Sequence, residues 1–73
     1  MEDYLILEIE EFQARTKNSL IQIGITHISN LTCLSARDLR FIYGIGKKGR
    51  ETILEFCLKN GIQLSERDYY LDA

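Results

Sequence analysis

The chain has 73 residues, 45% of them hydrophobic, and a formal net charge of −2. It is long enough for one small domain, and its hydrophobic content permits a compact core without a structural metal. No apolar run reaches the roughly 18 residues of a membrane span, and the N-terminus has no signal-peptide pattern, so we expect a cytoplasmic protein without a membrane partner. Cys33 and Cys57 lack metal-ligand and redox spacing, which predicts reduced thiols.

The small net charge hides a division along the chain. Residues 1–11 carry five acidic side chains and no basic one, residues 12–64 carry eight basic against three acidic ones, and residues 65–73 carry one basic against three acidic ones. A basic middle segment predicts an anionic partner, although a solvated charged surface is an alternative that every small domain needs. We therefore expect an acidic arm, a domain and an acidic tail over these three ranges.

The first half of the chain predicts two helices. Residues 1–11 alternate apolar and acidic side chains, which fits either an extended arm or a short helix. Helical spacing runs over residues 12–23 and is followed by Gly24, a typical residue after a helix C-terminus. Thr26 is a candidate N-cap for a short second helix.

A third helix is predicted after residue 34. Ser35 and Asp38 have the spacing of a capping box, and Leu34 and Leu39 are placed as a hydrophobic staple around it. The helix is expected to run through residue 42 and to stop at Gly44. A fourth helix follows, with an expected apolar face of Ile53, Leu54, Cys57 and Leu58.

The most informative motif is Gly44-Ile45-Gly46-Lys47-Lys48-Gly49, just before and within the start of the helix expected over residues 47–58. Its glycines permit a tight turn and close approach to another surface. Three cations, Lys47, Lys48 and Arg50, lie at the N-terminus of this expected helix. The free backbone N–H groups there suit a phosphate, whereas the helix dipole is unfavourable for cations. The pattern favours an anion site, and the alternative is a plain glycine-rich turn with solvated lysines.

In order and spacing, these residues resemble the C-terminal domain of the bacterial RNA polymerase alpha subunit over about residues 12–64. The segments that carry the resemblance are Arg15-x2-Asn18-x-Leu20, Gly24-Ile25-x2-Ile28-x2-Leu31, Leu39, and Gly44-Ile45-Gly46-Lys47-Lys48 with Ile53 beyond. The resemblance implies an all-α fold, a compact bundle of four short helices with two helix-hairpin-helix motifs, similar to a SAM domain.

The same resemblance implies a DNA-binding transcription module that needs no cofactor. Its expected partner is double-stranded DNA, bound in the minor groove of A·T-rich sequences upstream of promoters. Further expected partners are RNA polymerase, sigma factor or transcription activators, which would place the chain at the nucleoid. An alpha subunit also has a large N-terminal assembly domain, so we expect this chain to be either a fragment or a stand-alone relative.

The resemblance assigns roles to individual residues. Arg15 and Asn18 are implied to enter the groove, while Gly46 and Lys48 hold the flanking backbone. A narrow A-tract groove attracts an inserted Arg, and readout there separates mainly A·T from G·C. Without the resemblance, Arg15 and Asn18 also fit a solvent-facing helical pair. The remaining candidate DNA-binding residues are Ser19, Gly44, Lys47, Gly49 and Arg50.

The chain departs from the family pattern at several positions. Gly49 stands where serine is common, so a hydroxyl that could reach a phosphate is missing. Thr52 replaces a common acidic residue, which puts one contact with DNA or sigma factor in doubt. Ser19 stands where cysteine is frequent, which we expect to be a mild change.

Nothing in the sequence favours an enzyme. No Cys/His cluster has metal-ligand spacing, and no nucleophile has a visible base partner, so we expect no metal and no catalysis. Two further functions stay open beside the leading one. The first is a protein–protein adaptor that docks a transcription factor or polymerase subunit, and the second is a sequence-indifferent helix-hairpin-helix DNA binder.

Overall fold

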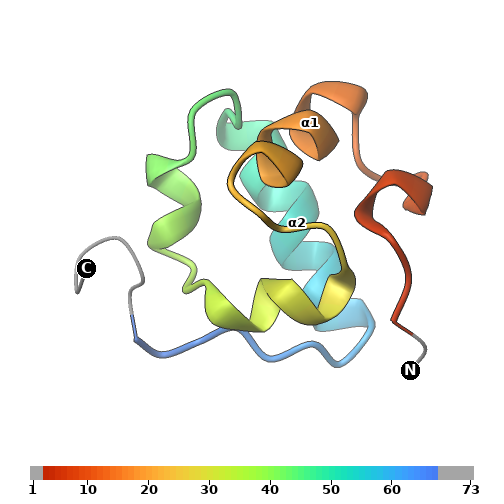
Figure 1. Cartoon of the computed structure of the whole chain (residues 1–73). Coiled ribbons are helices and arrows are strands. Elements are labelled where there is room, and N and C mark those ends of the chain that lie inside the picture. The colour runs from red at the N-terminus through yellow and green to blue at the C-terminus, as the bar shows by residue number, and fades with distance from the viewer. Residues whose placement is uncertain (1–2, 68–73) are drawn as a thin grey trace.

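The structure, a computed structural model, describes residues 3–67. All regular elements within this range are helical. The two α-helices are α1 (Ala14–Gln22) and α2 (Lys47–Lys59), and the three 3₁₀-helices are η1 (Ile6–Glu8), η2 (Ile28–Cys33) and η3 (Asp38–Phe41). In Figure 1, α2 crosses the centre of the molecule and the other elements surround it. None of the helices in residues 3–67 is long and apolar enough to cross a membrane.

The sequence predicts four short helices, of which the first and fourth are α-helices, whereas the second and third are not. Both are short 3₁₀-helices, six and four residues long. The buried residues explain this difference, because Ile28, Leu31 and Leu34 recur every third position. A spacing of three lines up side chains on a helix with three residues per turn, whereas an α-helix has 3.6. η3 is shorter, because the backbone of the buried Ile42 is extended (φ −82°, ψ 117°) and ends it after Phe41.

The predicted capping box is confirmed. The backbone N–H of Asp38 donates to Ser35 Oγ at 3.1 Å, and the backbone N–H of Ser35 donates to Asp38 Oδ2 at 2.9 Å. Both residues are buried, as are the expected staple residues Leu34 and Leu39. The box therefore forms as expected, but it closes the turn at residues 36–37, and η3 begins only at Asp38 with Arg37 as its N-cap.

The described part of the expected acidic arm belongs to the domain. Ile6 and Ile9 are buried in the same core as the helices. The N–H of Ile6 donates to the carbonyl of Thr26 at 2.9 Å, and the N–H of Ile28 donates to the carbonyl of Tyr4 at 3.0 Å. The boundary expected after residue 11 is thus not a boundary of the core.

The core gathers side chains from every element and from the loops between them. On α2, Ile53, Phe56 and Cys57 are buried, and the ring of Phe56 meets that of Phe12 edge-on with centroids 5.2 Å apart. Leu54 and Leu58, expected on the apolar face, are instead 39% and 85% exposed. Most of the expected acidic tail, residues 68–73, lies outside the described residues.

Candidate nucleic-acid interface

The candidate site centres on the hairpin, residues 44–49, which connects η3 to α2. Gly44 has a φ of +93°, a left-handed conformation that favours glycine. Ile45 is buried and its N–H donates to the carbonyl of Ile42 at 3.3 Å, which fixes the turn to the core. Gly46 is then the N-cap of α2, with φ −83° and ψ −174°. The turn is therefore held from inside while Gly46 lies at the surface.

Helix α1 packs against the hairpin at two glycines. A Cβ atom at Gly44 would collide with the hydroxyl of Ser19. A Cβ atom at Gly49 would lie 3.0 Å from Thr16 Oγ1 and 3.1 Å from Ile45 Cγ2. Thr16 and Ser19 are accordingly buried. The absence of side chains at Gly44 and Gly49 thus allows α1 to approach the start of α2 closely.

This packing determines where Arg15 and Asn18 lie. They are neighbours in sequence of the buried Thr16 and Ser19, and both are exposed. Positions three residues apart share a helix face, so the two side chains emerge together beside the hairpin. Lys17 is engaged elsewhere, because its Nζ donates to the carbonyl of Leu7 at 3.0 Å.

The N-terminus of α2 has no side-chain cap and is positively charged. Its first turn contains no acidic residue, and Gly46 gives it no side-chain cap. The first N–H groups of a helix have no partner within it. Within residues 3–67, no hydrogen bond or ion pair engages the side chains of Lys47, Lys48 or Arg50. Positive side chains, free donors and the helix dipole therefore add up to one anion-attracting end.

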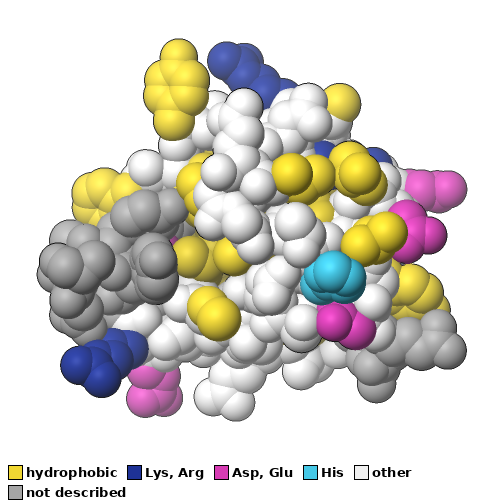
Figure 2. Space-filling model, in the orientation of Figure 1, with side chains coloured by type: hydrophobic (Ala, Val, Ile, Leu, Met, Phe, Trp, Pro, Cys, Tyr) yellow, Lys and Arg dark blue, Asp and Glu magenta, His cyan; other side chains and the backbone are white. Residues whose placement is uncertain are grey.

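A Cβ atom at Gly46 would have nothing within 4 Å, so the backbone there is open to an approaching group. Figure 2 shows Lys and Arg side chains projecting at its upper edge, over α1 and the hairpin, and acidic side chains gathered to the right, over the N-terminal segment. The surface potential is thus divided between two sides of a small molecule.

The expected site residues therefore fall into two groups. Ser19, Gly44 and Gly49 lie at the contact between α1 and the hairpin, where they set its spacing. The residues that reach the surface there are Arg15, Asn18, Gly46, Lys47, Lys48 and Arg50, the last of which is partly buried.

Comparisons of the chain with models of protein families, with curated proteins and with solved structures found no match.

Sequence reasoning missed two features near the site. Thr16 packs on Gly49, and only the spacing of three that it shares with Ser19 hinted at a common face. Arg37 and Arg40 line a groove with Lys47 and Arg50, and each pair is also three residues apart. Nothing in the sequence links the two pairs, because the fold alone brings η3 beside α2.

Thr52 does not extend the anion-attracting end. Its hydroxyl donates to the carbonyl of Lys48 at 2.9 Å, within α2. This hydrogen bond engages the Thr52 hydroxyl within the helix. Among residues 3–67, no three His, Cys, Asp or Glu side chains come together as metal ligands.

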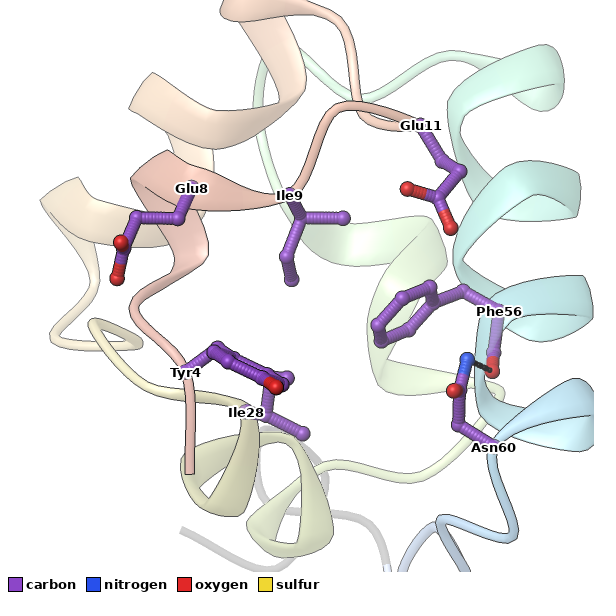
Figure 3. A pocket seen from close by; sticks show the side chains of 7 residues that line it. All are labelled: Tyr4, Glu8, Ile9, Glu11, Ile28, Phe56 and Asn60. Atoms are coloured by element: carbon purple, nitrogen blue, oxygen red, sulfur yellow. Dashed lines mark hydrogen bonds between the residues drawn. The ribbon is translucent and has the colours of Figure 1, made fainter. Parts of the chain in front are cut away.

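A separate hollow of about 280 Å³ lies at the other end of α2 (Figure 3). Its apolar lining includes Ile9 and Phe56, and Figure 3 shows Glu11 reaching toward the Phe56 ring. The amide of Asn60 donates to the carbonyl of Phe56 at 2.8 Å, which closes the helix end. Because this hollow is lined by Glu8 and Glu11 and by no cation, it is unsuited to the anionic ligand that the hairpin attracts.

Proposed function

We propose that this chain is a DNA-binding module of the transcription machinery, similar to the C-terminal domain of the bacterial RNA polymerase alpha subunit. It binds the minor groove of A·T-rich DNA upstream of promoters. The observation that carries the proposal is the uncapped, cationic start of α2 with the exposed Arg15 and Asn18 beside it. This module acts at the nucleoid, in contact with RNA polymerase, sigma factor or an activator.

The two Gly-Ile turns support a pair of helix-hairpin-helix motifs. Gly24 has a φ of +90° and Gly44 of +93°. Each is followed by an isoleucine, Ile25 or Ile45, that is buried in the core. In each case the turn leads into a second helix, η2 or α2. A repeated turn geometry with the same buried anchor is what a duplicated motif requires.

In the proposed complex, the hairpin positions the module and α1 reads the groove. A phosphate approaches the open backbone at Gly46, where the free N–H groups of α2 and the ammonium of Lys48 hold it. Arg15 then enters the adjacent minor groove, whose narrow A-tract form concentrates negative potential. Asn18 offers a hydrogen bond to the acceptors that A·T pairs present there.

The proposed binding is weak and depends strongly on salt. One small domain contacts few phosphates, and each neutralised phosphate lowers the slope of log K against log salt by about 0.9. With about three contacts, the affinity falls roughly 40-fold between 50 and 200 mM salt. Such weak binding suits a module that acts with a partner on neighbouring DNA.

Fluorescence anisotropy with an A-tract duplex and a G·C-rich duplex tests the proposal. The native chain is expected to prefer the A-tract, and Arg15→Ala is expected to lose that preference. Lys48→Ala is expected to weaken binding to both duplexes equally, because phosphates carry no sequence information. Lys59→Ala is the matched control, since Lys59 is an exposed cation at the far end of α2.

Two outcomes contradict the minor-groove proposal. The first is equal affinity of the native chain for both duplexes. The second is an A-tract preference that survives Arg15→Ala unchanged. Equal binding that depends on Lys48 but not on Arg15 instead selects a sequence-indifferent helix-hairpin-helix binder.

A protein–protein adaptor is the second candidate, and exposed apolar side chains favour it. Phe41 is 57% exposed and Leu58 is 85% exposed, and DNA binding at the hairpin uses neither. NMR titration separates the candidates, because DNA binding must shift the amide resonances of residues 15–18 and 44–50. If DNA leaves these resonances unchanged, the adaptor is the better account.

A further inference from the structure

A groove of about 510 Å³ lies between η3 and the first half of α2. Its charged lining consists of Arg37 and Arg40 from the η3 side, and of Lys47, Arg50 and Glu51 from α2. The other two lining residues, Ala36 and Leu54, are apolar. Four basic side chains thus share the groove with one acidic side chain. We call this feature the cationic groove.

The η3 wall of the cationic groove presents its basic groups outward and its acidic group inward. Arg37 and Arg40 are exposed and three residues apart, which is the repeat of a 3₁₀-helix, so they lie on one side of it. Asp38 is fully buried, and its carboxylate accepts the N–H of Ser35 at 2.9 Å. Leu39 is also fully buried and fixes η3 to the core. The exposed surface of this wall is therefore positively charged.

The α2 wall of the groove continues the positive charge of the hairpin. Successive residues of an α-helix are turned by about 100°, so Lys47 lies between Lys48 and Arg50 around the helix. Lys48 belongs to the phosphate site proposed at the hairpin, whereas Lys47 and Arg50 line the groove. Within residues 3–67, the side chains of Arg40, Lys47 and Arg50 form no hydrogen bond or ion pair. An arc of cations thus runs from the hairpin into the groove.

This arc fits a chain of phosphates better than a single anion. A duplex carries one phosphate for about 3.4 Å of axis on each strand. Lys47 and Arg50 are three residues apart on α2, which is about 4.5 Å along its axis. The guanidinium groups of Arg40 and Arg50 have the planar fork that matches two phosphate oxygens. A duplex at the hairpin extends past it, so its next phosphates meet these cations.

We propose that the cationic groove holds a second stretch of DNA backbone, beside the phosphate at Gly46 and Lys48. Arg40, Lys47 and Arg50 neutralise phosphates there and read no base sequence. Glu51 faces the same phosphates and weakens this second contact. The proposal rests on the proposed function for the presence of DNA at the hairpin, but it depends neither on Arg15 nor on a preference for A·T pairs.

Amide chemical shifts of the native chain, titrated with an A-tract duplex, locate the contact. DNA at the hairpin alone shifts the resonances of residues 15–18 and 44–50. DNA that also occupies the cationic groove is expected to shift the resonances of residues 37–40. Saturation with DNA that leaves residues 37–40 unshifted overturns the proposal.

The salt dependence of binding counts the phosphate contacts. About three contacts at the hairpin give a slope of about −2.7 for log K against log salt, and each groove contact makes it steeper by about 0.9. Arg40→Gln removes one groove cation and is expected to make the slope shallower by about 0.9, with the A-tract preference unchanged. Lys59→Gln removes the same charge from an exposed position at the far end of α2. Equal slopes of the two variants overturn the proposal.

Glu51 provides a test in the opposite direction. Glu51→Gln removes a negative charge from the groove lining and is expected to raise the affinity for either duplex about twofold or more. Glu55→Gln removes the same charge one helical turn further along α2, outside the lining, and is expected to have a smaller effect. Equal gains from both variants would mean that only the overall charge matters, which overturns the contact in the groove.

These results separate the proposal from the proposed function. An A-tract preference that depends on Arg15, together with equal slopes of Arg40→Gln and Lys59→Gln, overturns the groove contact and leaves the proposed function in place. Absence of the preference, together with a shallower slope for Arg40→Gln, supports the groove contact and overturns minor-groove recognition. If neither duplex binds, both proposals fail.

Discussion

The three glycines of the hairpin differ in what surrounds them. Gly44 combines a φ of +93° with close packing against Ser19. Gly49 lies within α2, where an added Cβ atom would be only 3.0 Å from Thr16 Oγ1. Gly46 has an ordinary φ and open space on its outer side. Substitutions at Gly44 and Gly46 therefore separate the requirements of folding from those of binding.

Gly44→Ala is expected to destabilise the fold. The left-handed conformation costs an L-residue about 1–2 kcal/mol, and the contact with Ser19 adds an overpacking cost of about 1–3 kcal/mol. Urea unfolding followed by circular dichroism measures the loss. The double variant Gly44→Ala/Ser19→Gly is expected to recover the overpacking part only. Unfolding of Gly44→Ala at the same urea concentration as the native chain contradicts this account of the contact.

The thiol of Cys57 provides a pH-dependent test of the core. Burial raises the pKa of Cys57 from 9.0 to about 11. The folded state thus holds the neutral thiol, and its stabilising effect is complete below pH 9 and is lost as the pH rises toward about 11. The free energy of unfolding of the native chain is expected to fall more steeply over this range than that of Cys57→Ala. Parallel pH profiles of the two proteins would argue against a buried thiol.

At the scale of elements, local signals in the sequence were enough to predict some of the helices and caps, but not all of them. The Ser35–Asp38 capping box and the two α-helices follow from caps and spacing within a few residues. The 3₁₀-helices are harder to predict, because a spacing of three over two turns fits an α-helix almost as well. The role of the N-terminal segment could not be predicted, since its partners are Thr26, Ile28 and Ser29, at least 20 residues away.

That N-terminal segment acts as a strap across η2. The carboxylate of Asp3 accepts hydrogen bonds from the N–H and the hydroxyl of Ser29, at 2.9 and 2.8 Å. The backbone hydrogen bond of Ser29 is the main cause that lowers the pKa of Asp3 below 3.8. The strap is anchored more firmly by Ile6, which is fully buried.

Ile6→Ala is expected to lower the free energy of unfolding by about 2–5 kcal/mol, as for other fully buried aliphatic side chains. Its neighbour Leu7 is 59% exposed and provides the matched control. Leu7→Ala is expected to change stability by less than about 0.5 kcal/mol. Chemical denaturation of both variants measures the difference, and similar small effects for both would mean that the segment is detached from the core.

At the scale of the whole molecule, the charge division seen in the sequence becomes a division in space. The acidic N-terminal segment covers one side, and the hairpin with α1 presents cations at another (Figure 2). A protein with a net charge of −2 can thus still present a positive end to an anionic partner, because the local field governs the final approach. The basic composition of residues 12–64 can be read directly from the sequence. The grouping of these cations around α2 cannot, because it depends on contacts between distant residues.

The most direct test of the central claim is Gly46→Asp at the N-cap of α2. Gly46 has the extended backbone of an N-cap, so an aspartate there should stabilise α2 by about 0.5–1 kcal/mol through capping and the helix dipole. The same carboxylate would repel a phosphate at the hairpin. Gln63→Asp, at an exposed position away from the hairpin, controls for the added negative charge.

The measurement is the affinity for an A-tract duplex by fluorescence anisotropy, together with the melting temperature of each variant. We predict that Gly46→Asp melts at a higher temperature than the native chain yet binds DNA at least tenfold more weakly than Gln63→Asp. DNA affinity of Gly46→Asp equal to that of Gln63→Asp would contradict the account, because the start of α2 would then not be the place where DNA binds.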